Sequence, residues 1–193
     1  MNICIFGSSG TTLDGIYYAE AENAGRLIAE HGHTLVFGGG KNGLMGAAAR
    51  GAHFAGGKVI GVAPRFFDEP GILFENCTEF IWTDTLSERK KLMEDISDAF
   101  LVLPGGMGTF EEFFEVLTLK QLWQNEKAIV LLNTGSYFDP LDVLLRDASV
   151  KGFVPHSCLD LYEICSEVGD ALYRIEYFIP RERGGRGIRD YNK

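Results

Sequence analysis

Short apolar segments alternate with longer amphipathic segments along almost the whole chain. The short segments predict strands at residues 3–6, 34–37, 58–63, 79–83, 99–103, 128–132 and 161–165. The longer segments predict helices at residues 14–31, 44–55, 86–97, 110–123, 140–151 and 167–178. Residues 99–103 (Ala-Phe-Leu-Val-Leu) are apolar at every position, which is typical of a strand buried on both faces. The alternation therefore predicts an α/β fold in which helices cover both faces of a doubly wound parallel sheet.

The length and composition fit one globular domain. The chain has 193 residues, of which 46% are hydrophobic, and no linker or repeat divides it. We expect a single α/β domain at residues 1–180. Residues 181–193 are rich in glycine and arginine and predict a flexible tail. An RNA-binding arm is the alternative interpretation of this tail.

The charge argues against general binding to nucleic acid. The net charge is −9, and the tail carries five basic and two acidic side chains, so residues 1–180 carry about −12. Such a surface repels a phosphodiester backbone. Any phosphate site must therefore be local.

The remaining composition predicts a cytoplasmic protein without membrane segments. The longest apolar runs, residues 99–103 and 128–132, are far shorter than the roughly 18 residues that span a bilayer. The N-terminus lacks the basic region and apolar stretch of a signal peptide. The four cysteines are scattered and predict reduced thiols, and neither they nor His31 and His33 predict a metal site.

Three glycine-rich loops follow predicted strands, at residues 7–10, 38–43 and 104–109. The loops after the strands of a parallel sheet lie at one edge, where ligands bind in open α/β folds. Glycines allow backbone amides to approach an anion, and the start of a helix adds unpaired N–H groups. Tight turns alone would explain one such loop, but three at one edge favour a nucleotide pocket.

Two nucleotide-binding motifs are incomplete. Residues 38–43 match G-x-G-x-x-G, but the position 20 residues after Gly43 is Ala63 instead of the acidic residue that binds a ribose hydroxyl. Asn42 follows Lys41 where a Walker motif needs Ser or Thr. A nicotinamide-dependent enzyme and a nucleoside triphosphatase are therefore disfavoured.

Two predicted helix starts carry charged side chains beside these loops. Residues 85–88 (Thr-Leu-Ser-Glu) and 109–112 (Thr-Phe-Glu-Glu) both match the capping-box pattern, which would explain Glu112 without catalysis. Three cations, residues 89–91 (Arg-Lys-Lys), follow the first of them, although a helix N-terminus disfavours positive charge. A bound phosphate or an acidic partner would account for them, and a solvated surface run is the alternative.

Together these segments resemble the LOG family, the cytokinin riboside 5'-monophosphate phosphoribohydrolases, which are often mislabelled lysine decarboxylases. The resemblance spans residues 2–153. It rests on residues 38–40 (Gly-Gly-Gly), 43–46 (Gly-Leu-Met-Gly), 88–90 (Glu-Arg-Lys) and 104–112 (Pro-Gly-Gly-Met-Gly-Thr-Phe-Glu-Glu). Leu-Ser at residues 86–87 replaces the Met-His of many members, which bears on base preference more than on the reaction.

The resemblance implies a Rossmann-like homodimer that hydrolyses the N-glycosidic bond of a purine nucleoside 5'-monophosphate to free base and ribose 5-phosphate. It implies no cofactor and no metal. The catalytic residues would be Glu112 and Arg89, and the substrate-binding residues would be Ser8, Ser9, Gly39, Gly40, Lys90, Gly105, Gly106, Gly108 and Thr109. A carboxylate beside the anomeric carbon would stabilise the oxocarbenium-like transition state and orient the attacking water. Arg89 would orient either the ribose hydroxyls or Glu112.

The scaffold also resembles molybdenum cofactor carrier proteins, which bind a phosphorylated pterin without turnover, but a carrier would not require both Glu112 and Arg89. The predicted helix at residues 110–123 carries more apolar side chains than contact with the sheet requires, which predicts a homodimer.

Overall fold

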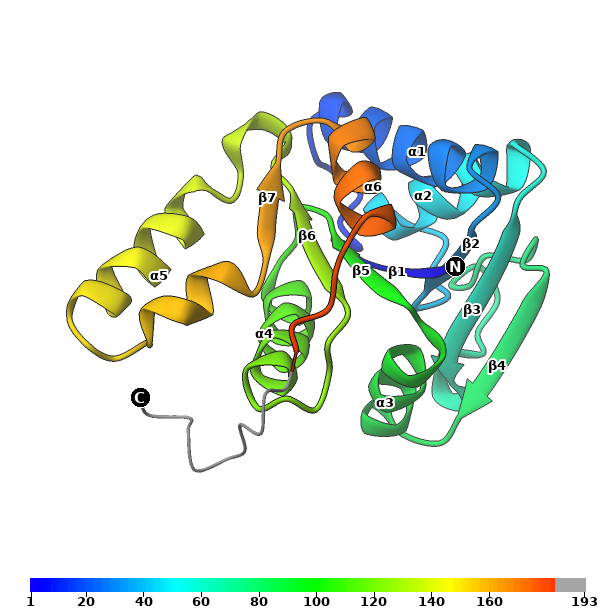
Figure 1. The fold of residues 1–193 in the computed structure, drawn as a ribbon. Coiled ribbons are helices and arrows are strands. Elements are labelled where there is room, and N and C mark those ends of the chain that lie inside the picture. Colours follow the sequence, from blue (N-terminus) through cyan, green and yellow to red (C-terminus); the bar gives the residue numbers. More distant parts are fainter. Residues whose placement is uncertain (183–193) are drawn as a thin grey trace.

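The computed structural model describes residues 1–182 of the chain. In this part, seven strands alternate with six helices, except that only a short 3-10 turn separates the third and fourth strands. The strands are β1 (Asn2–Phe6), β2 (Thr34–Phe37), β3 (Lys58–Pro64), β4 (Glu79–Thr83), β5 (Ala99–Val102), β6 (Ala128–Leu132) and β7 (Glu163–Cys165). The helices are α1 (Gly15–Glu30), α2 (Gly43–Phe54), α3 (Leu86–Ile96), α4 (Met107–Gln121), α5 (Asp139–Val150) and α6 (Val168–Glu176). Figure 1 shows their arrangement.

The strands form one parallel sheet in the order β4-β3-β2-β1-β5-β6-β7. The strand order reverses between β1 and β5, where Ile5 lies opposite Leu101. The loops after these two strands therefore diverge to opposite faces of the sheet and leave a crevice at their carboxyl ends. The predicted doubly wound parallel sheet is confirmed.

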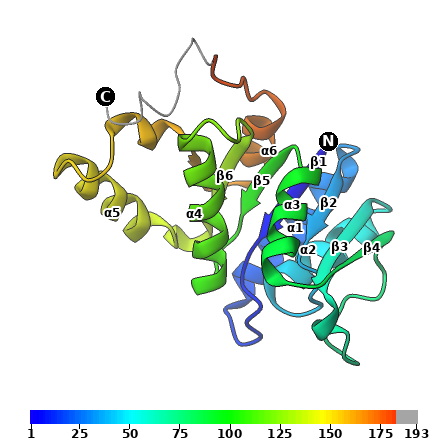
Figure 2. The same cartoon turned by 90° about the horizontal axis from the view of Figure 1, so that it is seen from below.

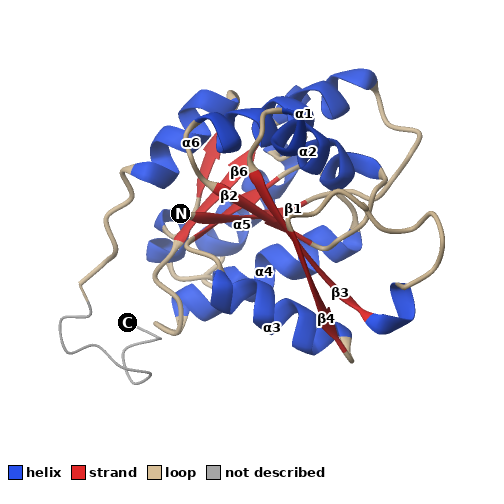
Figure 3. Cartoon of the chain, turned by 90° about the vertical axis from the view of Figure 1, so that its right-hand side faces the viewer, coloured by secondary structure: helices blue, strands red, loops and turns tan. Residues whose placement is uncertain are grey.

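Helices cover both faces of the sheet, and each face has its own hydrophobic core. The first core lies under α1, α2 and α6, and the second under α3, α4 and α5. Figure 3 shows α1, α2 and α6 on one side of the strands and α3 and α4 on the other. Seen from below, α3 and α4 lie next to the central strands (Figure 2), whereas α5 extends beyond the β7 edge of the sheet (Figure 1).

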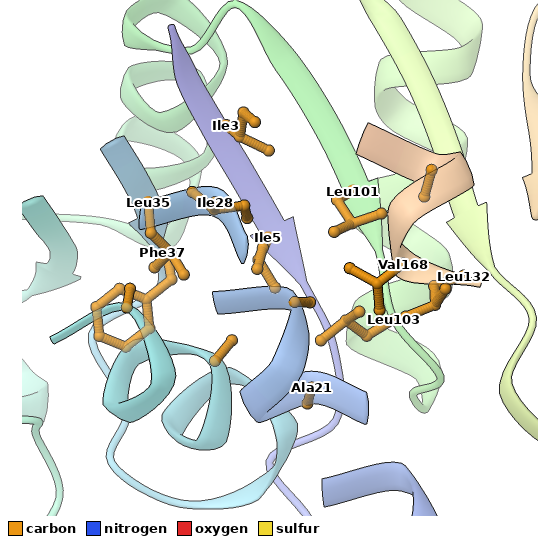
Figure 4. Packing of buried hydrophobic residues seen from close by; sticks show 14 of the residues in the cluster. Ile3, Ile5, Ala21, Ile28, Leu35, Phe37, Leu101, Leu103, Leu132 and Val168 are labelled. Atoms are coloured by element: carbon orange, nitrogen blue, oxygen red, sulfur yellow. The ribbon is translucent and has the colours of Figure 1, made fainter. Parts of the chain in front are cut away.

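Successive side chains of a strand point to opposite faces of the sheet, so one strand contributes side chains to both cores. In β1, Ile3 and Ile5 point into the first core (Figure 4), whereas Cys4 and Phe6 belong to the second. Leu101 lies beside Ile5 in the first core, and the neighbouring Phe100 faces the second. Strands buried on both faces need apolar residues at every position, as residues 99–103 predict.

The predicted boundaries agree with the structure to within two residues, except at the start of one helix. The helix expected at 110–123 begins three residues earlier, at Met107, whereas the strand expected at 161–165 is shortened by two residues to Glu163–Cys165. Gly32 follows α1 with a φ of +77°, a conformation that favours glycine at the end of a helix.

The capping box at the start of α3 is confirmed. The Thr85 hydroxyl accepts a hydrogen bond from the Glu88 amide at 3.1 Å, and the Glu88 carboxylate accepts one from the Thr85 amide at 3.3 Å.

We expect Thr85→Ala to lower the free energy of unfolding by about 1 kcal/mol, because one amide of the first turn loses its partner. Urea unfolding monitored by circular dichroism measures this change. Thr118→Ala on the exposed face of α4 is the matched control and should change stability by less than about 0.5 kcal/mol; an equal loss in both variants would contradict the capping role.

The chain beyond α6 packs back onto the domain. Arg181 binds the Glu126 carboxylate at 2.7 Å and lies over the Trp123 ring, with 4.1 Å between its guanidinium carbon and the ring centroid. The first residue of the predicted flexible tail is thus held in place, and residues 183–193 lie outside the described residues. Across residues 1–182, no helix is long and apolar enough to span a membrane.

Candidate active site

Hydrogen bonds between backbone groups join the three glycine-rich loops into one surface. The Ser8 amide donates to the Pro104 carbonyl at 3.1 Å, and the Leu44 amide donates to the Ser8 carbonyl at 2.8 Å. Gly43 has a φ of +65°, and a Cβ atom there would lie 2.2 Å from the Ser8 carbonyl oxygen. Only glycine allows the start of α2 to approach the first loop this closely.

The connection between β3 and β4 adds a fourth segment that the sequence did not predict. Leu73 forms an isolated antiparallel bridge with Gly40, and the Lys41 amide donates to the Ile72 carbonyl at 3.0 Å. These bonds hold Ile72 and Leu73 beside the second glycine-rich loop. Phe67, in the 3-10 turn after β3, lies on the same side of the site.

These segments surround a pocket of about 580 Å³ at the carboxyl ends of β1, β2 and β5. The volume lies in the usual range of small-molecule sites. Backbone and polar groups line one part of the pocket, and apolar side chains line another. The lining residues are Gly7, Ser8, Ser9, Gly38, Gly40, Asn42, Met45, Phe67, Ile72, Leu73, Arg89, Gly106, Met107, Gly108, Thr109 and Glu112.

The start of α4 faces this pocket without a side-chain cap, so the predicted capping box at residues 109–112 is wrong. The cap residue is Gly106, whose carbonyl accepts from the Phe110 amide at 3.0 Å, and Thr109 lies within the first turn. With glycine at the cap position, the helix begins three residues before the start predicted from Thr109. The first-turn N–H groups have no partner within the helix, and together with the helix dipole they favour an anion.

Glu112 lies one turn further along α4 and pairs with Arg89 of α3. The Arg89 Nη2 atom donates to Glu112 Oε1 at 3.1 Å, and the two side chains are only 11% and 9% exposed. The Arg89 Nε atom is buried and has no hydrogen-bond partner among the described residues. The ion pair that lines the pocket therefore leaves a buried guanidinium donor without a partner in the described part of the chain.

The surroundings of Glu112 bring its titration into the neutral range. Burial raises the pKa of Glu112 to about 7, and the charge of Arg89 partly opposes this rise. The neighbouring Glu111 raises the pKa further, whereas Lys90 lowers it. A carboxylate with a pKa near 7 can exchange a proton at neutral pH, as a general acid or base must.

The structure brings eight of the eleven predicted site residues into the pocket wall. They are Ser8, Ser9, Gly40, Arg89, Gly106, Gly108, Thr109 and Glu112. Gly39 is behind the wall, where a Cβ atom would lie 2.9 Å from the Phe80 ring. Gly105 supports the wall, because its carbonyl accepts a hydrogen bond from the Tyr137 hydroxyl at 2.5 Å.

Lys90 does not line the pocket. Its ammonium pairs with Glu111, and with Glu115 at 3.1 Å, both of α4. Lys91 similarly pairs with Asp95 on its own helix. Contacts between and within helices thus account for two of the three cations whose position the sequence left unexplained, and only Arg89 points into the site.

Sequence reasoning missed the apolar wall. Phe67, Ile72 and Leu73 lie in an irregular connection without a motif, and Met107 is 86% exposed at the pocket edge. The sequence indicated this wall only through hydrophobic residues that lie outside any predicted strand or helix.

Comparison with known proteins gives the family. The family model described as "Possible lysine decarboxylase" matches residues 45–175. A cytokinin riboside 5'-monophosphate phosphoribohydrolase of Rhodococcoides fascians is 40% identical over 156 residues, which cover 80% of this chain and 79% of that protein. The chain belongs to the LOG family. A LOG enzyme of the same name from Mycobacterium tuberculosis is also 40% identical, over 79% of this chain and 81% of its own.

Solved structures share the fold of this LOG protein. The molybdenum cofactor carrier protein of Chlamydomonas reinhardtii aligns with a TM-score of 0.70 at 25% identity, covering 91% of this chain and 95% of that chain. A molybdenum cofactor binding protein from Rippkaea orientalis aligns with a TM-score of 0.69 at 23% identity, covering 91% and 94%. The α/β fold is thus common to LOG proteins and these carriers.

Proposed function

We propose that this LOG protein hydrolyses the N-glycosidic bond of a purine nucleoside 5'-monophosphate, releasing the free base and ribose 5-phosphate. The observation that carries the proposal is the buried pair of Arg89 and Glu112 beside the uncapped start of α4. The relatives named as phosphoribohydrolases, at 40% identity, support the same reaction.

In the proposed complex, the phosphate binds the first-turn amides of α4 and the Thr109 hydroxyl, because both donate to an anion. The ribose then lies over Glu112, and the base extends toward the apolar wall of Phe67, Ile72 and Leu73. The phosphate holds the sugar in place, so binding energy far from the reacting bond is converted into rate.

Glu112 acts on the anomeric carbon in this proposal. As the C1'–N bond breaks, the ribosyl group becomes cationic, and a carboxylate beside it stabilises that charge and orients the attacking water. Arg89 binds one oxygen of Glu112 in the structure and leaves the other for water or substrate. This contact favours Arg89 as the group that orients Glu112.

Lysine decarboxylation, the activity in the description of the family model, lacks support in the pocket. A pyridoxal phosphate enzyme binds its cofactor through a lysine amine. The side chains that line the pocket among the described residues include no lysine, and Lys41 lies outside the wall. The described wall therefore offers no amine for that chemistry.

The test is incubation with a panel of nucleoside 5'-monophosphates, including AMP and its N6-prenylated analogue, with chromatography for released base. Release of a base from any member supports hydrolysis and identifies the preferred base. Tight binding of a phosphorylated pterin without release of any base would support the carrier alternative instead, which the structural similarity to carrier proteins brings into consideration.

The pKa of Glu112 predicts a pH dependence. If the ionised carboxylate is the active form, kcat/KM should be constant above pH 8 and fall about tenfold per unit well below pH 7. Initial rates between pH 5.5 and 9 measure this limb. The residual activity of Glu112→Gln should lack this acid limb, which distinguishes ionisation of Glu112 from ionisation of the substrate phosphate. An acid limb that persists in Glu112→Gln would contradict its assignment to Glu112.

We also propose that the protein is a homodimer. Phe113 and Leu117 of α4 are buried in the second core, but Phe114 and Met107 of the same helix are 37% and 86% exposed, and Leu86 at the start of α3 is 46% exposed. We expect light scattering at micromolar concentration to give twice the monomer mass of 21.3 kDa. A mass near the monomer value would contradict this proposal.

A cytosolic location is proposed as well. Cys4, Cys158 and Cys165 are buried as free thiols, and Cys77 is partly buried. Such thiols persist in reducing compartments. Fractionation of cells that express the full-length protein tests this proposal.

A further inference from the structure

The glycine that follows β2 lies directly against the guanidinium of Arg89. A Cβ atom on Gly38 would be 2.2 Å from Nη2, 2.9 Å from Cζ and 3.3 Å from Nε of Arg89. Favourable contacts between nonbonded heavy atoms are about 3.5–4.0 Å. Any side chain at position 38 therefore displaces the guanidinium from its observed place.

Backbone conformation does not explain this glycine. Seven glycines among the described residues have positive φ angles, but Gly38 is not one of them. Alanine can therefore adopt the conformation of residue 38 without strain. What requires glycine at this position is the space that Arg89 occupies.

The displaced atoms are those that contact Glu112. Nη2, the atom closest to the Gly38 position, is also the donor to Glu112 Oε1. The guanidinium is thus confined between the backbone of residue 38 and the Glu112 carboxylate. Because Arg89 is the end of a flexible side chain, it can move at little cost to the fold, and the main consequence is a weaker contact with Glu112.

We propose that Gly38 is a positioning residue for hydrolysis, because its missing side chain leaves the space in which Arg89 lies when it orients Glu112. This inference rests on the proposed function for its effect on rate. Its effect on Glu112 itself is a property of the protein without substrate, so it can be measured separately.

The charged groups around Glu112 set the direction of that effect. Arg89 and Lys90 of α3 lower the pKa of Glu112, and Glu111, its neighbour on α4, raises it. On the sheet side, Glu112 is close enough to the buried Cys4 thiol of β1 to raise the pKa of that thiol. Arg89 is the largest of the influences that lower the Glu112 pKa, so its displacement should raise this pKa above 7.

The test compares Gly38→Ala with the wild type by NMR titration of protein carrying ¹³C-labelled glutamate, without substrate. We expect the Glu112 pKa to rise by about one unit or more, as loss of a neighbouring opposite charge predicts. In kinetic assays, kcat/KM at pH 7 should fall about fivefold or more, and the acid limb should move to higher pH by the same interval. A Glu112 titration unchanged from wild type would overturn the proposal.

Two further variants separate positioning from a general effect on the fold. Gly15→Ala, at an exposed glycine with no atom within 4 Å of the added carbon, should change neither the Glu112 titration nor the rate. In an Arg89→Ala background the space beside residue 38 is empty, so adding Gly38→Ala should not lower Tm and should not change the Glu112 pKa further. In that background, a further fall in Tm, or a further rise in the Glu112 pKa as large as in the Gly38→Ala single variant, would overturn the proposal. If the wild type released no base, the proposed function would fail, whereas the NMR titration would still decide the role of Gly38.

Discussion

Replacement of Glu112 by glutamine should lower kcat by at least ~100-fold with little change in KM. The amide oxygen of glutamine can accept the hydrogen bond from Arg89 Nη2, so the pocket keeps its shape and loses only the negative charge. The helix start is unaffected, because α4 begins at Met107 and Glu112 takes no part in its cap. Steady-state kinetics with the preferred nucleotide measure both constants.

The adjacent carboxylate supplies the control for this prediction. Successive residues of a helix point about 100° apart, and Glu111 is exposed and pairs with Lys90 instead of facing the pocket. Glu111→Gln should therefore keep kcat within about twofold, since it removes no group that lines the pocket and the lost surface ion pair affects only stability, by at most ~1 kcal/mol. Equal losses in the two variants, or a normal rate for Glu112→Gln, would remove Glu112 from the reaction and favour the carrier alternative.

Removal of the 5'-phosphate from the substrate should lower kcat/KM by roughly 1,000-fold. Two charge-assisted hydrogen bonds of ~2 kcal/mol each account for a loss of this size. Four donors are available for them, the uncapped amides at residues 107–109 and the Thr109 hydroxyl, so two bonds are the minimum that this site offers. Comparison of adenosine with AMP, or of the corresponding pair for the preferred base, measures the ratio.

A chelator distinguishes this phosphate site from a metal-dependent one. Backbone amides bind an anion without a bridging cation, so EDTA should leave turnover within experimental error of the untreated protein. Loss of activity on chelation, restored by a divalent cation, would contradict recognition by the helix terminus. Cleavage of adenosine as fast as AMP would contradict it equally.

Local sequence patterns determined the order and type of the elements. Strands buried on both faces carry the uninterrupted apolar runs seen at residues 99–103, and the side-chain pattern at Thr85 and Glu88 determined the start of α3. Both features depend on residues close together in the chain. The glycine-rich loops likewise indicated the edge of the sheet at which the pocket lies, because parallel strands all end at the same edge.

Local sequence patterns did not predict the start of α4, where glycine residues precede the helix. Thr109 and Glu112 have the spacing of a capping box, yet the helix begins at Met107, because Gly106 can enter a helix without a side-chain partner. That difference changes the function of the segment. A capped helix would have used an amide internally, whereas the uncapped one leaves its first-turn amides free for an anion.

Only the tertiary structure decided which charged side chains belong to the site. Arg89 and Lys90 are neighbours in sequence, but the packing of α3 against α4 directs the first to Glu112 and the second to Glu111 and Glu115. The apolar wall depends on a bridge between Gly40 and Leu73, 33 positions apart in the chain. The sequence by itself determined the fold and the edge of the sheet that carries the pocket. Contacts between distant segments decided the rest, because no local pattern records which side chains a folded chain brings together.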